Sequence, residues 1–382
     1  MDFDLTSDQL DVQKLCREFA DGEIAPHAEE WDAKAEFPLV VVKKMAELGL
    51  LGLPFPEQYG GAGADTVSYA LAVMEIGRGD ASVGITMAAH VSLGAAPILM
   101  FGSEEQKQKF LVPLARGEQL WAFGLTEPQA GSDAGATKTT AELNGGRWVI
   151  NGTKCFITNA GTPMTGGVTI TAVTGTGPDG KPEISNIIVP QETPGYARAK
   201  PYKKMGWRAS DTRELSFQNA AVPEDHLLGP RGKGFRQFLD TLDGGRISVG
   251  ALSVGLSQAC YDAAARYAKE RSQFGQPIAK FQAVQFQLVD MAVEIDLART
   301  AVLKAAWLKD KGRDFAQASA MAKLFSGEVS RRCANAAVQI HAGYGFMDEY
   351  PVSRYWRDCK INEIGEGTNV VQRMVIARQL GF

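Results

Sequence analysis

The chain has 382 residues, of which 45% are hydrophobic and 22% are charged, as is typical of a folded globular protein with a sizeable core. Its formal net charge of −4 argues against a nucleic-acid binder, which usually carries a strongly basic face. We expect no membrane span, because no apolar run approaches the ~20 residues that a span needs. The N-terminus, Met1-Asp2-Phe3-Asp4-Leu5, shows neither a signal-peptide core nor an Arg-rich transit pattern.

Cysteine and histidine usage bears on the compartment and on metal binding. The five cysteines are odd in number, scattered and never in a Cys-x-x-Cys pair, which suits unpaired thiols in a reducing cytosol. The four histidines are far apart and lack the spacing of metal ligands. We therefore expect a cytoplasmic protein without a metal centre.

Residues 1–120 are predicted to form a helical domain. Thr6-Ser7-Asp8 offers an N-cap, and Leu10, Leu15 and Phe19 follow at helical intervals. Residues 85–101 are apolar with many small side chains, and ordinary helix packing is the preferred interpretation of that stretch.

Residues 121–230 are predicted to form a small antiparallel β-domain, because β-branched and aromatic runs alternate with turn dipeptides. Asn151-Gly152 between two such runs predicts a hairpin turn. Pro178-Asp179-Gly180 predicts a second hairpin. The stretch 175–180 also matches the G-x-G-x-x-G pattern of dinucleotide-binding turns, but it leads into a strand rather than a helix, so we reject that interpretation.

Residues 231–382 are predicted to be helical again, with long helices over 234–270, 281–310 and 314–340. The expected fold class is therefore α+β, mainly α. Its parts are an N-terminal helical domain (1–120), a middle antiparallel β-domain (121–230) and a C-terminal helical bundle (231–382).

A single carboxylate stands between two glycines near the C-terminus, in Ile364-Gly365-Glu366-Gly367-Thr368-Asn369. Thr368 or Asn369 is placed to cap the amphipathic helix that follows. Glycines allow close approach, so Glu366 could be pressed against a ligand. Alternatively, it is an ordinary acidic residue beside a positive helix N-terminus.

Two further segments suit ligand binding but also have plain structural interpretations. Residues 125–133 follow a strand with hydroxyls, small residues and a proline, which describes either a ligand-binding loop or a surface turn. Arg271-Ser272-Gln273-Phe274-Gly275 ends a helix with a cation and an aromatic ring, and a helix C-cap alone would explain it.

Five motifs in fixed order resemble the acyl-CoA dehydrogenase family, and the resemblance covers essentially the whole chain. They are Thr126-Glu127-Pro128-x-Ala130-Gly131-Ser132-Asp133, Asn151-Gly152-x-Lys154-x-Phe156-Ile157-Thr158-Asn159, Met205-Gly206-x-Arg208-x-Ser210-Asp211-Thr212, Arg271-x-x-Phe274-Gly275 and Glu366-Gly367-Thr368. Five ordered motifs are far more specific than any one of them.

The resemblance implies a C-terminal four-helix bundle, a homotetramer and one FAD per subunit. The residues implied to line the flavin are Phe123, Leu125, Thr126, Gly131, Ser132, Phe156, Ile157 and Thr158, with the Thr158 hydroxyl near N5. Those implied to reach a neighbouring subunit's FAD are Arg271, Gln273, Phe274, Gln282, Gln339, Ile340 and Gly343, with the arginine meeting the pyrophosphate. Thr368, Asn369 and Val370 would lie beside the dinucleotide at a helix N-terminus.

The resemblance also implies a reaction, the α,β-dehydrogenation of an acyl-CoA thioester to the 2-enoyl-CoA. Glu366 would abstract the α-proton, FAD N5 would accept the β-hydride, and the electrons would pass to an electron-transfer flavoprotein. The residues implied to contact the substrate are Ser132, Asp243, Arg246, Gly365 and Gly367. Some family members carry the base on the helix around residue 245, but here that position is Gly245, which leaves Glu366.

The chain departs from the family pattern at two positions near the implied site. Phe156 stands where many relatives have Trp, so the ring is kept but the indole N–H is lost. Gly365 stands where Tyr is common, which predicts a wider pocket that tolerates branched or bulky acyl groups. Two alternative functions stay open: a flavin oxidase or monooxygenase of the same fold, and a non-catalytic helical assembly protein. Retention of Glu366 and Arg246 favours the dehydrogenase.

Overall fold

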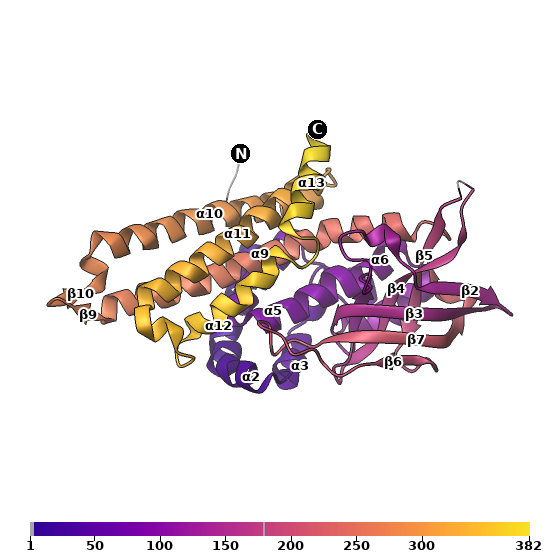
Figure 1. Ribbon diagram of the computed structural model, residues 1–382, viewed down its shortest axis with the longest axis horizontal. Coiled ribbons are helices and arrows are strands. Elements are labelled where there is room, and N and C mark those ends of the chain that lie inside the picture. The colour runs from indigo at the N-terminus through magenta and orange to yellow at the C-terminus, as the bar shows by residue number, and fades with distance from the viewer. Residues whose placement is uncertain (1–3, 179) are drawn as a thin grey trace.

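The computed structural model describes residues 4–178 and 180–382, and it shows an elongated molecule with helices at one end and a β-sheet at the other (Figure 1). The N-terminal helices are α1 (Ser7–Phe19), α2 (Ala28–Lys34), α3 (Leu39–Glu47), α4 (Thr66–Gly79), α5 (Ala81–Ala88), α6 (Ala96–Phe101), α7 (Glu104–Gln106) and α8 (Val112–Ala115). Between them lie the π-helical turns η1 (Ala20–Ile24), η5 (Ala89–Ala95) and η6 (Lys107–Leu111) and the 3-10 turns η2 (Ala25–His27), η3 (Leu50–Gly52) and η4 (Glu57–Tyr59). Thr6 caps α1 as predicted, in a capping box with Gln9.

The helical stretch Ala81–Phe101 corrects one expectation. By length and composition alone its 21 residues could cross a membrane, so the chain does contain an apolar run of that size. The stretch comprises α5, η5 and α6, and 83% of its most apolar window is buried inside the fold. It contacts strand β1 and helix α9, which identifies it as a core helix of this protein.

Strands β1 to β8 form one sheet in the order β6-β7-β3-β2-β4-β5-β8, with β1 beside β4, and two later strands, β9 (Ser272–Gln273) and β10 (Gln276–Pro277), pair separately. Their bounds are β1 Leu120–Gly124, β2 Thr140–Asn144, β3 Arg147–Thr158, β4 Thr165–Thr176, β5 Pro182–Pro190, β6 Tyr196–Arg198, β7 Thr212–Pro223 and β8 Leu227–Leu228, with the 3-10 turns η7 (Ala134–Ala136) and η8 (Glu224–His226) between strands. The sheet is mainly antiparallel as expected, but β1–β4 and β2–β4 are parallel pairs.

The predicted hairpin turn at Asn151-Gly152 is wrong. These residues lie inside the continuous strand β3, at a register shift against β7, where the Asn219 N–H donates to Asn151 Oδ1 at 2.8 Å. The turn that joins β2 to β3 is Gly145-Gly146, with φ of 57° and 74°. Because a bulge and a primed turn both favour Asn and Gly, the dipeptide alone does not distinguish them.

The second predicted hairpin joins β4 to β5, and the Gly177 N–H donates to the Lys181 carbonyl at 2.8 Å. Asp179, part of that predicted turn, lies outside the described residues. The strand β5 that follows confirms that the glycine pattern over 175–180 does not open a helix.

The C-terminal part contains the long helices α9 (Gly234–Glu270), α10 (Gln282–Asp310) and α11 (Ala316–His341), close to the predicted ranges. The shorter elements are β9 (Ser272–Gln273), β10 (Gln276–Pro277), η9 (Ile278–Lys280), η10 (Ala342–Phe346), α12 (Pro351–Asp358), η11 (Cys359–Glu363) and α13 (Asn369–Gln379). Helices α9, α10 and α11 pack on one another, and α13 packs on α11. The predicted mainly helical α+β class is confirmed.

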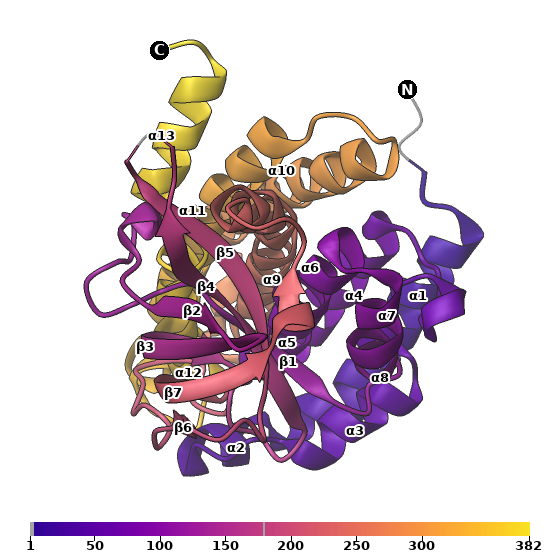
Figure 2. The same ribbon diagram turned by 90° about the vertical axis from the view of Figure 1, so that its right-hand side faces the viewer.

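Two hydrophobic cores organise the described residues. One core is shared by the N-terminal helices and the C-terminal helices, and the other lies within the sheet. Helices α4 and α9 approach closely, since a Cβ on Gly255 would lie 2.1 Å from the Met74 carbonyl oxygen. Figure 2 shows the N-terminal helices beside the sheet and the long helices behind it.

Helix α12 is tied to both other parts of the chain. Arg357 forms an ion pair with Asp32 of α2 at 2.5 Å. The Trp207 N–H, from the loop before β7, donates to Asp358 Oδ1 at 2.6 Å. The segment that leads to Glu366 is therefore fixed where the three parts of the chain meet.

Candidate active site

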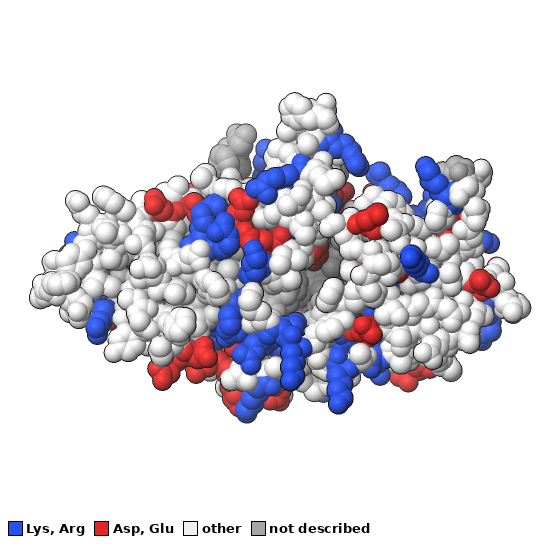
Figure 3. Space-filling model, in the orientation of Figure 1, with Lys and Arg blue, Asp and Glu red and all other residues white. Residues whose placement is uncertain are grey.

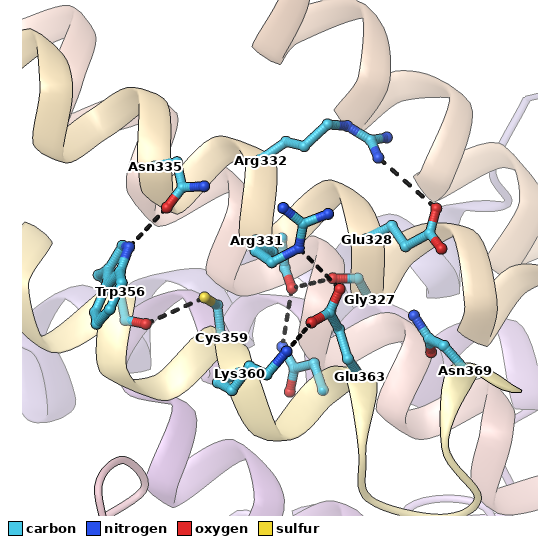
Figure 4. A network of polar contacts seen from close by, with 12 residues as sticks. Gly327, Glu328, Arg331, Arg332, Asn335, Trp356, Cys359, Lys360, Glu363 and Asn369 are labelled. Carbon is cyan, nitrogen blue, oxygen red and sulfur yellow. Dashed lines mark hydrogen bonds and ion pairs between the residues drawn. The ribbon is translucent and has the colours of Figure 1, made fainter.

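The segment before Glu366 is clamped to helix α11 by a network of polar contacts (Figure 4). The indole N–H of Trp356, on α12, donates to Asn335 Oδ1, on α11, at 2.6 Å. Glu363 accepts from Arg331 at 2.9 Å and from Lys360 at 2.6 Å, which fixes the last residues of η11. These contacts set the point from which the Glu366 loop departs.

The loop that carries Glu366 has an unusual backbone conformation, and its C-terminal side is held by the cap of α13. Glu366 has φ of 54°, a left-handed conformation that is uncommon for a residue other than glycine, and Gly367 follows with φ of 89°. The Thr368 side chain accepts from the Val371 N–H at 3.3 Å, so Thr368 is the N-cap of α13, one of the two capping residues predicted. Strain of this kind is often found at functional sites.

Two buried side chains hold the carbonyl groups of this loop. Lys323 Nζ donates to the Gly367 carbonyl at 2.8 Å and to Asn369 Oδ1 at 3.2 Å. Gln372 Nε2 donates to the Gly367 carbonyl at 2.9 Å and to the Glu366 carbonyl at 3.2 Å. Neither role could be predicted from the sequence, because a lysine or a glutamine on a helix usually faces solvent.

The Glu366 carboxyl is buried without a hydrogen-bond partner. Both of its oxygens are inaccessible and accept no hydrogen bond from the described residues. Burial raises the pKa of Glu366 to about 7, and the charges of Lys323 and Arg246 partly offset that rise. The group can therefore exchange a proton near neutral pH, which is the property of a general base.

Gly245 of α9 makes the space that this carboxyl occupies. A Cβ at position 245 would lie 2.2 Å from Glu366 Oε2 and 2.9 Å from Leu93 Cδ2. The carboxyl thus lies directly against the backbone of α9 at Gly245, and Leu93 packs at the same position. A second carboxylate at position 245 could not share this space with Glu366.

Two residues beside Gly245 on α9, Asp243 and Arg246, were predicted to contact substrate. Arg246 is buried, its guanidinium pairs with Asp243, and its Nε has no hydrogen-bond partner among the residues described. An unpaired buried donor beside the Glu366 carboxyl is suited to an oxygen atom of a ligand. Ser132, a third such residue, is exposed on the loop after β1.

A group of hydroxyls lies near the carboxyl, and the sequence interpretation missed it. Tyr69 of α4 donates to the Ala88 carbonyl at 3.3 Å, and Ser92 Oγ lies 3.0 Å from Ser248 Oγ. Burial raises the pKa of Tyr69, and the charge of Glu366 adds to that rise. Ser92 lies in the π-helical turn η5, an irregularity that the apolar pattern of 85–101 could not reveal.

The predicted flavin-lining residues come together where β1 and β3 end. The Cys155 N–H donates to the Thr126 carbonyl at 2.9 Å, and the buried Lys154 pairs with Glu127 at 2.7 Å. These contacts hold the loop that carries Leu125, Thr126, Gly131 and Ser132 against β3. Phe123 stacks on Phe238 with ring centroids 4.0 Å apart.

The end of β3 presents alternate side chains to opposite sides. Phe156 has φ of 61° and its side chain is 67% exposed, whereas Ile157 is buried in the sheet core. Ile157 could therefore contact a cofactor only through its backbone. Thr158 is half-buried opposite Thr212 of β7.

A second group of predicted cofactor residues meets near the ends of helices α9 and α11, away from the sheet. Arg271, Gln273, Ile340 and Gly343 line one cleft of about 500 Å³ together with Tyr267 and Tyr344. The cleft lies by the β9–β10 tip, which Figure 1 shows at the far end of the long axis from the sheet. Within one chain the two groups therefore do not meet.

The remaining predicted residues surround these two groups. Phe274 is 93% exposed at the β9–β10 tip, and Gln282 and Gln339 are also exposed. At the start of α13, Asn369 is buried and Val370 is exposed, while Gly365 and Gly367 flank Glu366. Figure 3 shows the surface hollowed between the sheet and the C-terminal helices.

The residues present fit a dinucleotide with a flat aromatic ring, provided that two copies of the chain contribute. The exposed Phe156 ring beside the Thr158 hydroxyl suits an aromatic ring system. The Arg271 guanidinium, 5.5 Å from the Tyr344 ring, suits a phosphate. The Asn369 Nδ2 is a buried donor without a partner among the residues that the structure describes.

Models of three protein domains match the chain in succession. They are described as the N-terminal domain of acyl-CoA dehydrogenase (residues 6–118), the middle domain (residues 122–220) and the C-terminal domain (residues 232–381). A relative from Bacillus subtilis (strain 168), described as "Probable acyl-CoA dehydrogenase YngJ", is 58% identical over 380 residues and covers 100% of both chains.

Solved structures agree over the full length. Butyryl-CoA dehydrogenase from Megasphaera elsdenii is 44% identical with a TM-score of 0.96, and the match covers 100% of both chains. A solved chain described as "Electron transferring flavoprotein of Acidaminococcus fermentans: Towards a mechanism of flavin-based electron bifurcation" is 46% identical with a TM-score of 0.97, again over 100% of both chains.

Proposed function

The chain belongs to the acyl-CoA dehydrogenase family of FAD-dependent oxidoreductases, and from that premise we propose that Glu366 is the base of its reaction. The reaction would remove the α-proton and the β-hydride of an acyl-CoA thioester and leave a Cα–Cβ double bond. Glu366 would take the α-proton. FAD, when bound, supplies an acceptor for the β-hydride, which no side chain can replace.

The observation that carries this proposal is the buried, unpartnered carboxyl of Glu366 opposite Gly245. A base works best when its pKa lies near the working pH, and burial brings the pKa of Glu366 to about 7. The left-handed backbone at Glu366 and the clamped segment before it fix the direction of the carboxyl. Preorganisation of this kind lowers the entropic part of the barrier.

The chain's own residues would also hold the cofactor, in two separate halves. Phe156, Thr158 and the loop over 125–132 would hold the ring system of FAD. Arg271 and Gln273 from a neighbouring copy would meet its phosphates. Support comes from the separation of the two groups within one chain, since the second group lies by the β9–β10 tip, away from the sheet.

We infer that the protein is a homo-oligomer, a dimer at least and a tetramer by analogy with the family. Helix α10 carries an exposed apolar stripe at helical spacing, formed by Phe286, Val289, Val293 and Leu297. Sedimentation of the FAD-loaded protein would test this, and a monomer with a full complement of FAD would contradict it.

The proposed partners are an acyl-CoA and an electron-transfer flavoprotein, the second supported by the solved chain described under that name. A cytoplasmic location is also proposed, since all five cysteines are buried free thiols.

The proposed reaction can be tested by adding butyryl-CoA to the yellow enzyme without oxygen. We expect the flavin absorbance to bleach, and to return when an electron-transfer flavoprotein is supplied. Fast return with oxygen alone, while product is present, would favour the same-fold oxidase. A purified protein without a flavin band would favour the non-catalytic assembly protein.

A prediction about substrate preference rests on Gly365. A Cβ there would lie 3.5 Å from the Ile361 carbonyl oxygen, so a side chain can be added without a clash. We expect the wild type to accept isobutyryl- and isovaleryl-CoA, and Gly365→Tyr to lower kcat/KM for them about tenfold relative to butyryl-CoA. The panel would include octanoyl-CoA. A strong straight-chain preference in the wild type would remove the hypothesis.

A further inference from the structure

Lys323 is a fully buried cation next to the proposed base. It lies on α11, it is 0% exposed, and its Nζ donates to the Gly367 carbonyl at 2.8 Å and to Asn369 Oδ1 at 3.2 Å. Both acceptors are within three residues of Glu366. A buried ammonium is unfavourable unless it is well paired, so its retention here calls for a reason.

Of the charges near the Glu366 carboxyl, that of Lys323 has the largest effect. Burial raises the pKa of Glu366, and Lys323 opposes this more than Arg246 does. In return, Glu366 holds up the pKa of Lys323, which burial lowers to about 8. Each charge therefore favours the ionised form of the other.

Other titratable groups face the pair from each neighbouring element. Arg246 comes from α9 and is itself paired with Asp243. Tyr69 comes from α4, and Glu363 from η11 acts on Lys323. On η5, the two ring nitrogens of His90 make hydrogen bonds to the Leu114 carbonyl and the Trp121 N–H. Burial lowers the pKa of His90 to about 4, so its ring is neutral.

Gln372 provides a natural comparison, because it also holds the carbonyl groups of the Glu366 loop but carries no charge. Its Nε2 donates to the same Gly367 carbonyl at 2.9 Å and to the Glu366 carbonyl at 3.2 Å. The loop is thus held by two side chains, of which only one carries a charge.

We propose that Lys323 is a positioning residue whose ammonium, bonded to the Gly367 carbonyl and to Asn369 Oδ1, both secures the Glu366 loop and favours the ionised form of the Glu366 carboxyl. This inference rests on the proposed function, since it concerns the same base. The positive charge offsets the cost of burying a carboxylate that accepts no hydrogen bond from the described residues. Without it the carboxyl would hold its proton at the pH where a base must be free.

The test separates charge from mechanical support. Lys323→Gln keeps an N–H donor but removes the charge, Lys323→Met removes both, and Gln372→Met removes only a neutral donor. The Glu366 carboxyl would be titrated by infrared difference spectroscopy without substrate, with Glu366→Gln identifying its band. The pH profile of kcat/KM would be measured in parallel.

We expect both Lys323 variants to raise the pKa of the Glu366 carboxyl by about one unit or more, and to move the rising limb of kcat/KM to higher pH equally. Gln372→Met should leave the position of that limb unchanged. An unshifted carboxyl in Lys323→Gln would overturn the role of the charge. Normal turnover by Glu366→Gln would instead overturn the proposed function, and the infrared titration distinguishes these failures.

Discussion

Replacing Glu366 by glutamine is expected to lower turnover about 10²- to 10⁴-fold while FAD and acyl-CoA still bind. Glutamine has nearly the same shape but cannot accept the α-proton. Since both carboxyl oxygens make no hydrogen bond to the described residues, the replacement breaks no contact of the loop. Anaerobic addition of butyryl-CoA should perturb the flavin spectrum of the variant without bleaching it. Bleaching at the wild-type rate would show that another group removes the proton.

The same variant should be more stable than the wild type at neutral and higher pH. Burial raises the pKa of Glu366 from 4.5 to about 7, so the folded state binds a proton that the unfolded state has released. Stability from this group is therefore present below about pH 4.5 and is lost as pH rises through about 7. Melting curves should show a higher Tm for Glu366→Gln at pH 8 and a shrinking difference towards pH 5. An equal Tm at every pH would contradict the shifted pKa.

Replacing Gly245 by alanine should lower kcat/KM about 100-fold, through displacement of the base. The new Cβ would meet Glu366 Oε2 at 2.2 Å and Leu93 Cδ2 at 2.9 Å, so the carboxyl must move. The helix itself should not suffer, because alanine is a better helix former than glycine.

Gly244→Ala is the matched control for this experiment. It adds the same methyl group to the same helix one residue earlier, where the nearest atom is Lys309 Nζ at 3.5 Å. We expect near-normal kcat/KM for the control, with a Tm that is unchanged or slightly raised because alanine favours the helix. Equal activity of the two variants would show that the space over Gly245 does not control the base.

The general fold could be predicted because its signals are local and long. The apolar periodicity of α9, α10 and α11 and the N-cap at Thr6 can be seen in short stretches of consecutive residues. The helix ranges predicted from them are close to those observed. Asn151-Gly152 failed because its preferred backbone angles serve a bulge as well as a turn. Whether a strand stops there depends on pairing with β7, which is far away in the sequence.

The site was predicted in part, for a similar reason. The Gly-Glu-Gly loop and the glycine at 245 are visible as residue types, and the structure brings them together. The roles of Lys323 and Gln372 were missed, because nothing in a helix sequence shows that a polar side chain will be buried beside another segment. The assignments of individual cofactor residues stay predictions that the experiments above address.

The division of the buried residues into two cores has a consequence for synthesis of the chain. Helices α4 and α5 find their packing partners in α9, more than 150 residues later, whereas the sheet closes on its own strands. During synthesis the amino-terminal helices therefore emerge from the ribosome with apolar faces exposed. These faces stay exposed, and can bind chaperones, until α9 has been made. A released chain truncated near residue 230 should therefore resist protease mainly over residues 121–230, where the sheet is complete.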